Sequence, residues 1–424
     1  MRILLIKPRW FEFNGVYKIL NRIRFTPLHL GILAALSPGH EVRVIDADWD
    51  PIPYQDQFDL VGITVTTFTS TQAYTIAEQF KQTGAKVVMG GAHASLLPEE
   101  CLQYADAVVI GEAEYVWPEI LNDVATGSLK KTYQSSRVVD MNDVPFPKRE
   151  LLHEQDWVAC IQATRGCPHT CAYCYLPSVP WASYRKRDIE LVYQELSRMR
   201  QQVIFFVDDN MFADEDYAIA LFNRIAPLKK LITIQAPTTI ARNPKLVEAM
   251  ANAGCFYLQM GFQTVNPRSL EWASINQNKV SEYKKTISLL HQYKMLITGF
   301  FMFGFDTDTP EIFKQTTDMV KEMDLDYTHF YILTLYPGTK LYTKFKQENR
   351  VLEDKERTCY GWTKVMFKPA SMTPEQLELG VAKANDEIHW HYVKKLPRKL
   401  VAHTGLMLRE PNLLLSVLGG VLRK

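Results

Sequence analysis

Short apolar runs separated by amphipathic segments recur in the first part of the chain. Five apolar runs of strand length end in glycine or polar residues, and helical segments such as residues 71–82 lie between most of them. The runs are residues 1–8, 41–48, 59–67, 85–91 and 106–112. Such alternation is typical of a parallel, doubly wound sheet, in which a ligand binds at the carboxyl ends of the strands. We therefore predict a Rossmann-like α/β domain over residues 1–135.

The same pattern begins again after a linker. Pro145 and Pro147 lie among polar residues, and because proline cannot join a central strand they predict a linker over residues 136–156. Strands are then predicted at 202–210, 231–237, 255–264, 295–309 and 328–339, with helices at 188–200, 243–253, 280–293 and 310–323. Repeated strand and helix units predict a partial (β/α)6 TIM-like barrel over residues 157–346, with its site at the carboxyl ends of the strands.

The last region, residues 347–424, is predicted to be mainly helical. Thr373, followed by Pro374 and Glu375, is a typical helix start. After residue 393 the chain has seven Lys or Arg against one acidic residue, Glu410, and it ends in PNLLLSVLGGVLRK. A basic, apolar ending of this kind can lie on an anionic membrane surface, and it can equally pack on the barrel. Both interpretations stay open.

Composition narrows the class of protein. Hydrophobic residues make up 47% and charged residues 22%, which is typical of a globular chain, and the formal net charge of +1 gives no global field for nucleic acid. Seven cysteines, three of them in one loop, predict a reduced cytoplasmic protein and not a disulfide scaffold. The apolar runs are shorter than the roughly 20 residues of a membrane-spanning helix.

The candidate chemistry centres on residues 164–175, TRGCPHTCAYCY. Cys167, Cys171 and Cys174 have C-x3-C-x2-C spacing. Three thiolates can each bind one iron of a 4Fe–4S cluster, which leaves one iron without a protein ligand. The alternatives are a zinc site with His169 as the fourth ligand, or buried cysteines that only pack.

This loop resembles that of the radical S-adenosylmethionine (SAM) enzymes, in which an aromatic residue, here Tyr173, precedes the third cysteine. The resemblance implies that the open iron chelates the amino and carboxylate groups of SAM. It also implies that the reduced cluster splits SAM to a 5′-deoxyadenosyl radical, with electrons from an external donor such as flavodoxin or ferredoxin.

Several polar residues at strand ends are candidates for the SAM side. Asp208, Asp209 and Asn210 end an apolar strand, where they can face the cofactor or cap the next helix. Gln263 and Thr264 stand in GFQT, where the family often has G-x-E-S with the acid on the ribose. Gln263 can still hydrogen-bond a hydroxyl but carries no charge.

A glycine-bearing strand near residue 304 completes the SAM side. Gly304 and Asp306 lie in a segment that resembles the family's adenine-facing strand. The alternative is that Gly304 marks a bulge or a close packing contact.

The first domain resembles the cobalamin-binding domain of one large subset of these enzymes. The resemblance rests on GGAHASLLPEE and DAVVIGEAEYVWPEI. The cobalamin-side candidates, all in loops after strands, are Thr64, Thr66, Gly90, Gly91, His93, Gly111 and Glu112. The D-x-H-x-x-G motif that supplies a histidine to cobalt is absent after the first strand, where the chain reads KPRWFEFNG. Cobalamin is therefore expected without that ligand, and His93 is either an alternative contact or a hydrogen-bonding loop residue.

The resemblance implies a cobalamin-dependent enzyme that methylates an unactivated carbon of a small-molecule substrate. A lipid, a tetrapyrrole or a natural-product intermediate fits this expectation. The first alternative is an oxidative ring closure or rearrangement, as in the oxygen-independent cyclases of tetrapyrrole synthesis. A cobalamin- or zinc-binding regulator without catalysis is the alternative of a different class.

Overall fold

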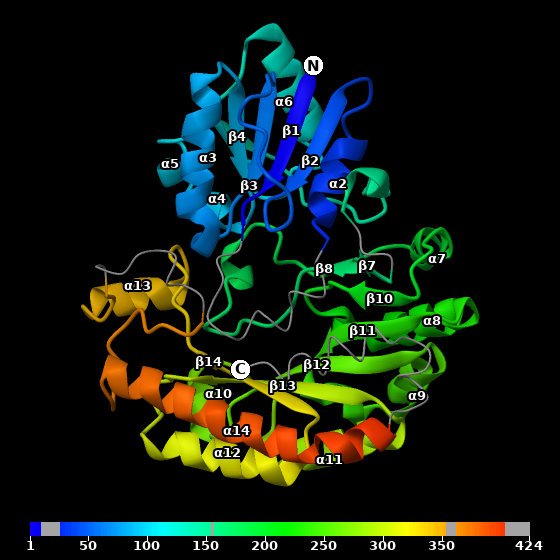
Figure 1. Cartoon of the computed structure of the whole chain (residues 1–424), viewed down its shortest axis with the longest axis vertical. Coiled ribbons are helices and arrows are strands. Elements are labelled where there is room, and N and C mark those ends of the chain that lie inside the picture. The colour runs from blue at the N-terminus through cyan, green and yellow to red at the C-terminus, as the bar shows by residue number, and fades with distance from the viewer. Residues whose placement is uncertain (10–25, 154–156, 353–361, 403–424) are drawn as a thin grey trace.

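The computed structural model describes residues 1–9, 26–153, 157–352 and 362–402. It contains two parallel six-stranded sheets, each with helices packed against it, and they form two domains that face each other (Figure 1). A two-stranded antiparallel pair, β8 (Thr164–Arg165) with β9 (Arg185–Lys186), flanks the loop that holds the three cysteines.

The first sheet has the order β2-β1-β3-β4-β5-β6, and all its neighbouring strands are parallel. The strands are β1 (Arg2–Lys7), β2 (Glu41–Asp46), β3 (Leu60–Thr64), β4 (Lys86–Gly90), β5 (Ala107–Ile110) and β6 (Thr132–Gln134). The helices are α2 (Leu28–Ala35), α3 (Ser70–Gln82), α4 (Ala92–Leu96), α5 (Pro98–Cys101) and α6 (Trp117–Thr126).

Helices cover both faces of this sheet, which explains its continuous apolar strands. Leu4 and Ile6 of β1 pack with α3, whereas Ile3 and Leu5 pack with α2 and α6. The predicted doubly wound domain is confirmed. The sequence pattern does not reveal β6, because its three residues, TYQ, include two exposed polar ones.

The second sheet has the order β14-β13-β12-β11-β10-β7, again fully parallel. The strands are β7 (Val158–Ile161), β10 (Val203–Phe206), β11 (Leu231–Ala236), β12 (Cys255–Gln263), β13 (Leu296–Phe303) and β14 (Tyr327–Ile332). Its helices are α7 (Ile189–Ser197), α8 (Glu215–Ile225), α9 (Pro244–Asn252), α10 (Pro267–Trp272), α11 (Tyr283–Gln292) and α12 (Glu311–Met323). β7 and β14 are the two edges, so the sheet is the predicted open, partial barrel.

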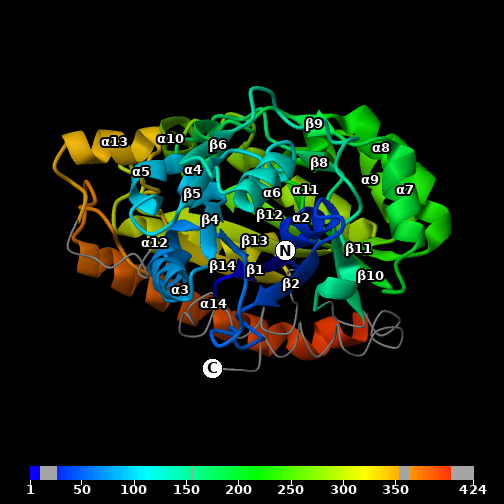
Figure 2. The ribbon, with the colours of Figure 1, turned by 90° about the horizontal axis from the view of Figure 1, so that it is seen from above.

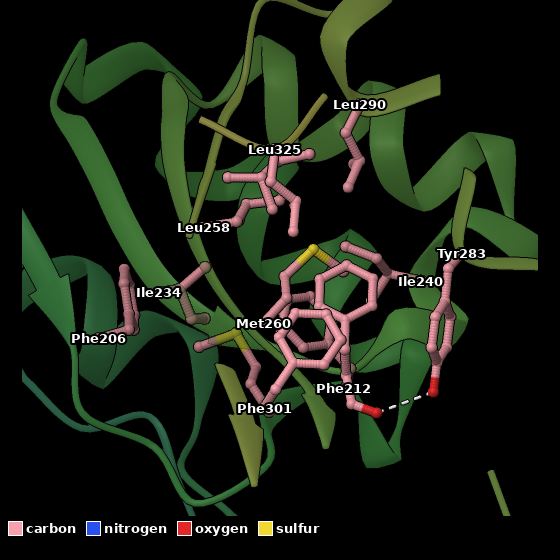
Figure 3. Close-up of a cluster of buried hydrophobic side chains, with 14 of the residues drawn as sticks. Phe206, Phe212, Ile234, Ile240, Leu258, Met260, Tyr283, Leu290, Phe301 and Leu325 are labelled. Atoms are coloured by element: carbon pink, nitrogen blue, oxygen red, sulfur yellow. Dashed lines mark hydrogen bonds between the residues drawn. The ribbon is translucent and has the colours of Figure 1, made fainter. Parts of the chain in front are cut away.

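The helix-covered face of the second sheet forms the largest core. Figure 3 shows part of it, where Phe301 and Met260 meet side chains of neighbouring strands and helices. The Phe262 and Phe301 rings stack with centroids 5.4 Å apart. Tyr283 donates a hydrogen bond to the Phe262 carbonyl at 2.8 Å, which is the dashed line from Tyr283 in Figure 3. These contacts hold the sheet so that its other face is left for the site.

The C-terminal region adds α13 (Lys340–Gln347) and α14 (Pro374–Ala402), which runs along the second domain beside α12 (Figure 1). Leu377 and Tyr392 of α14 are buried, and the Tyr392 hydroxyl lies 2.6 Å from Thr328 Oγ1 of β14. The helical C-terminal region is therefore confirmed. The tail for which we considered membrane contact lies largely beyond Ala402, outside the described residues. No helix among those described is long and apolar enough to cross a membrane.

The first domain lies over the open face of the second sheet. Seen from above, its strands overlie β11 to β14, with α7 and α8 at one end (Figure 2). In the segment predicted as a linker, Val139, Met141 and Val144 pack with Ile32 of α2. This arrangement turns the carboxyl-end loops of the first sheet toward the second domain.

Candidate active site

The three cysteines are free and lie in a loop after β8. Cys171 is buried, and Cys167 and Cys174 are partly buried. Two amide groups donate to their sulfurs: Asn210 Nδ2 to Cys167 Sγ at 3.5 Å, and Gln277 Nε2 to Cys171 Sγ at 3.7 Å. Hydrogen bonds of this kind to cysteine sulfur tune the reduction potential of iron–sulfur clusters.

Burial makes two of these thiols, those of Cys171 and Cys174, poor acids by themselves. It raises the pKa of Cys171, and it raises that of Cys174 to about 12. Bound iron would supply the positive charge that a thiolate needs in such a place, so the donor set fits a cluster. Among the described residues, no three His, Cys, Asp or Glu side chains converge on a position for one metal ion. In a cluster each thiolate binds a different iron.

Two carboxylates hold the start of the cysteine loop. Asp208 is 4% exposed, and it accepts hydrogen bonds from the Ala163 amide and from the Thr164 amide and hydroxyl. Asp209 accepts from the Gly166 amide at 2.8 Å. Gly166 has φ +88°, and a Cβ there would lie 2.1 Å from the Ser183 carbonyl oxygen, so this position requires glycine.

These contacts distinguish the three residues that end β10. Asp208 is committed to the backbone of the loop, and its contact with SAM stays a prediction that these hydrogen bonds do not favour. Asp209 also lines the cavity described below. Asn210 is buried beside Cys167, and its Oδ1 has no hydrogen-bond partner in the described structure. An orphaned acceptor next to the cysteines suits a ligand with an amino group, which SAM has.

Gln263 occupies a strained turn at the end of β12. Its φ is +69°, and the β12–β13 register shifts between Gly261 and Gln263. A Cβ at Gly261 would lie 2.2 Å from Gln263 Nε2, so the missing side chain makes room for this amide. Strained backbone often accompanies a functional side chain. Thr264 is buried and accepts from the Asn266 amide, and SAM contact by either residue stays a prediction.

The segment near Gly304 has structural partners. Gly304 has φ +103°, and a Cβ there would lie 2.9 Å from Leu377 of α14, which agrees with the alternative of close packing. Asp306 pairs with Arg350 at 2.5 Å. Asp308, which we did not predict, accepts from the Gly304 and Phe305 amides and fixes this turn. The adenine contact of this segment stays a prediction.

A cavity of about 1230 Å³ lies between the two domains. This volume exceeds the roughly 300–1,000 Å³ of ordinary small-molecule pockets, as expected for more than one ligand or a very large one. Six cobalamin-side candidates line it: Thr64, Thr66, Gly90, Gly91, Gly111 and Glu112. From the cysteine side, Arg165, Tyr175 and Asp209 line the same space. The cavity therefore reaches from the cobalamin-side loops to the two ends of the cysteine loop. Of the SAM-side candidates only Asp209 lines it, and the three cysteines are not among its lining residues.

The first domain offers a fitting cradle for a large flat ligand. Besides the loops, the cavity extends along an apolar slot between β3, β4 and the helix face, where Gly62, Val88 and Trp117 line it. A Cβ at Gly62 would lie 2.8 Å from Leu5 Cδ2 and would narrow the slot. The residues present thus fit cobalamin.

His93 does not line this cavity. It is 1% exposed, and its Nε2 lies 2.9 Å from the Tyr74 hydroxyl inside the first domain. The alternative contact with cobalamin that we considered for His93 is not supported by this position, which agrees with a hydrogen-bonding loop residue.

A different histidine, His29 at the start of α2, lines the cavity. Its side chain is exposed to this space, and the protein atoms around it, with Lys7 and Arg165 adding positive charge, lower its pKa to about 4. The imidazole is therefore neutral at pH 7. No motif around His29 identifies it in the sequence.

Charged side chains tie the cobalamin-side loop to the cysteine loop. Glu112 accepts from Arg165 at 2.6 Å and from Arg185 at 2.8 Å, and Arg165 also donates to Glu114 at 2.8 Å. Burial alone would lower the pKa of Arg165, but Glu114 and Glu112 outweigh it and raise that pKa. Because Arg165 is two residues before Cys167, this network couples the two cofactor regions.

The far wall of the cavity comes from the middle of the barrel strands. Side chains at alternate positions of neighbouring strands share one face of a sheet. The wall residues are Tyr257, Gln259, Thr298, Phe300, Tyr327, His329 and Tyr331. Sequence reasoning missed them because it looked only at strand ends. Polar and aromatic residues at alternate positions of strands buried on both faces were the available signal.

Comparisons with known proteins support this geometry. The family model of the Radical SAM superfamily matches residues 161–320, and that of the B12 binding domain matches residues 26–121. The chain is 29% identical to the bacteriochlorophyllide d C-12(1)-methyltransferase of Chlorobaculum tepidum, over 86% of this chain and 82% of that protein. It is also 29% identical to the C-8(2)-methyltransferase of that organism, over 88% of each.

The fold is shared with a solved structure. The radical SAM methyltransferase TsrM of Kitasatospora setae, with cobalamin and a [4Fe-4S] cluster bound, superposes with a TM-score of 0.68 at 17% identity. The match covers 89% of this chain and 84% of that one. Together with the two family models, the cysteine loop confirms the predicted cofactors: a 4Fe–4S cluster, SAM and cobalamin. The chain belongs to the radical SAM enzymes that carry an N-terminal B12-binding domain.

Proposed function

We propose that this enzyme transfers a methyl group to an unactivated carbon of a large, flat, apolar ring substrate, of the tetrapyrrole class. The observation that carries the proposal is the single cavity, which joins the B12-binding loops, the cysteine loop and an aromatic wall. The bound cluster, SAM and cobalamin would supply hydrogen-atom abstraction and the methyl group.

The chain's own residues bind, orient and exclude water. Cys167, Cys171 and Cys174 would hold the cluster, while Asp208 and Asp209 fix the loop that carries them. The loops around Gly90 and Gly111 would hold cobalamin from the opposite side of the cavity. A site enclosed between two domains keeps solvent away from reactive intermediates.

The substrate class rests on the wall and on the relatives. Aromatic rings bury large apolar areas and favour edge or stacked contacts with other rings. Phe300, Tyr327 and Tyr331 provide such rings on one side of the cavity. The two methyltransferases of Chlorobaculum tepidum act on bacteriochlorophyllide d, a flat ring of this kind. The chain is also 23% identical to the hopanoid C-2 methylase of Rhodopseudomonas palustris. A polycyclic lipid is therefore the second candidate substrate class.

The test is anaerobic turnover of the reconstituted enzyme with bacteriochlorophyllide d, a reductant and SAM that carries a deuterated methyl group. We expect mass spectrometry to find a product in which one hydrogen of the substrate is replaced by a deuterated methyl group. The matched control is the variant with all three loop cysteines changed to alanine, which should give no product. Unmodified substrate with the wild-type enzyme would contradict the proposed substrate class.

Oxidative ring closure is the second candidate. The anaerobic magnesium-protoporphyrin IX monomethyl ester cyclase of Cereibacter sphaeroides is 23% identical, over 75% of this chain and 58% of that protein. Magnesium-protoporphyrin IX monomethyl ester serves as its probe in the same assay. A product that gains a ring without any label would favour this candidate over methyl transfer. A regulator without catalysis would consume no SAM with either substrate.

A further inference from the structure

We propose, building on the proposed function, that His329 binds the central magnesium of the tetrapyrrole substrate through its imidazole. A magnesium ion held by four ring nitrogens keeps an axial position open for a neutral donor. Imidazole is the most common metal ligand among side chains. Such a bond would fix the height and the position of the ring in the cavity, and thereby the carbon that faces the methyl donor.

The alternation of β14 turns His329 toward the cavity. Tyr327, His329 and Tyr331 line it, whereas the residues between them point the other way. Thr328 Oγ1 reaches Tyr392 of α14, and Phe330 is 1% exposed in the barrel core. His329 itself is 9% exposed, so its ring is held by packing and open only to the cavity.

Neighbouring aromatic rings fix the orientation of the imidazole. The rings of Phe300 and Tyr331 lie nearly parallel to that of His329, each at 15°, with centroids 5.6 Å and 5.9 Å away. The Tyr327 ring meets it edge-on at 4.8 Å. When an imidazole binds the metal of a macrocycle axially, the plane of the macrocycle is perpendicular to the plane of the imidazole. The two parallel rings would therefore meet the same macrocycle edge to face, a favoured aromatic geometry.

The imidazole is available as a ligand. Within the described part of the chain no hydrogen bond engages its ring nitrogens, and the same is true of the Tyr327 and Tyr331 hydroxyls, whereas the Tyr257 hydroxyl pairs with Thr298 Oγ1 at 2.7 Å. Burial lowers the pKa of His329 to about 4, so the ring is neutral at pH 7 and keeps a nitrogen lone pair. A buried, neutral imidazole that faces a cavity satisfies its nitrogen with whatever occupies that cavity, and a metal of the bound substrate can take this place.

The substitution His329→Phe tests the role of the nitrogen. Phenylalanine keeps the cluster of nearly parallel rings but removes the donor atoms. His329→Gly leaves room for added free imidazole, which can then replace the missing ligand. His291→Ala is the matched control, because His291 lies on α11 and pairs with Asp326 outside the cavity. Circular dichroism of each full-length variant verifies folding.

The experiment compares binding of bacteriochlorophyllide d with binding of the same compound after acid has removed its magnesium. We expect the wild type and His291→Ala to bind the magnesium form about tenfold more tightly, a difference of about 1.4 kcal/mol. We expect His329→Phe to lose this preference. Resonance Raman bands report the coordination number of magnesium. Compared with the free compound, these bands should shift when it binds the wild type or His329→Gly with imidazole, but not when it binds His329→Phe.

An unchanged magnesium preference in His329→Phe would overturn the inference, even if labelled methyl is still transferred. That outcome would leave the proposed function intact. If neither form of the tetrapyrrole binds the wild type, the proposed substrate class fails and the role of His329 fails with it. Label transfer to the magnesium-free compound at the wild-type rate would also contradict the need for an axial ligand.

Discussion

The first domain meets the cavity with the loops that follow its strands and with an apolar slot beside β3 and β4, whereas the second domain meets it with polar and aromatic side chains from the middle of its strands. Gly90 is the last residue of β4, and Gly111 directly follows β5. Phe300 and His329 lie inside β13 and β14. Helices cover both faces of the first sheet, so its loops and this slot are what it offers a ligand, whereas the partial barrel leaves one face free of its own helices.

This difference separates two tasks. Small residues at the sheet edge let a large cofactor approach the backbone. Side chains on the inner face of the barrel give a substrate its specific contacts. The cysteine loop lies between the two regions, and the Glu112 network connects it to the first domain. Variants can therefore separate the two halves of the cavity.

The largest effect is expected from the cysteines. Changing Cys167, Cys171 and Cys174 to alanine should remove the cluster and abolish turnover, because no other described side chains replace these ligands. Cobalamin binding should persist, since its loops belong to the other domain. Iron, sulfide and cobalamin analyses of one preparation measure both. Cys255→Ala, a buried cysteine of β12, is the control and should keep the cluster. Loss of cobalamin along with iron would contradict separable halves.

Gly166→Ala should damage the cysteine loop next most severely. Two effects destabilise alanine at this position: the left-handed φ of +88°, and a distance of 2.1 Å between the added Cβ and the Ser183 carbonyl oxygen. Gly84→Ala has the same φ of +88° with nothing within 4 Å, so it isolates the backbone cost of roughly 1–2 kcal/mol. We expect iron content to fall sharply only in Gly166→Ala. Equal iron content in the two variants would show that the loop can move aside.

Glu112→Gln should weaken both halves together. It leaves Arg165 and Arg185 short of a buried partner, and breaking a buried ion pair costs about 3 kcal/mol. We expect a lower melting temperature and lower retention of both cobalamin and iron. Glu190→Gln, which breaks an exposed pair with Arg224, should leave all three unchanged. A Glu112→Gln protein that loses neither cofactor would remove the coupling role.

The smallest effect concerns pH. Burial raises the pKa of Asp208 to about 7, so between about pH 4 and pH 7 the folded protein holds a proton that the unfolded chain has released. The free energy of unfolding should therefore fall as the pH rises through this window. Asp208→Asn cannot ionise, and its melting temperature should decline less over the same range. Identical slopes for both proteins would show that Asp208 does not titrate there.

The sequence was sufficient for the two sheets and the cysteine loop, but only for part of the cavity. The cobalamin-side loops follow from topology alone, because the carboxyl ends of parallel strands share one edge of a sheet. The contact of Asp208 and Asp306 with SAM stays a prediction, and the sequence did not show that their side chains also hold a backbone loop and Arg350. Chain order does not reveal which partner a strand-end carboxylate will find.

The inner wall was hidden for a different reason. In β13 and β14 the core-facing positions are mostly apolar, and the cavity-facing positions also carry large aromatic rings among their polar residues, so the alternation that marks this face is weak. His329 looked like one more position of a buried strand. Only the packing of the first domain above it makes that face the wall of a cavity. Tertiary structure decided this residue, as local pattern could not.

The most direct test of the central claim is electron paramagnetic resonance of the anaerobically purified, reduced protein, recorded with and without SAM. We predict the signal of a reduced 4Fe–4S cluster. The line shape of this signal should change when SAM is added, because the iron without a cysteine ligand is free to bind SAM. A protein that shows no such signal, or a signal that SAM leaves unchanged, would contradict the assignment of Cys167, Cys171 and Cys174 as the ligands of an open cluster.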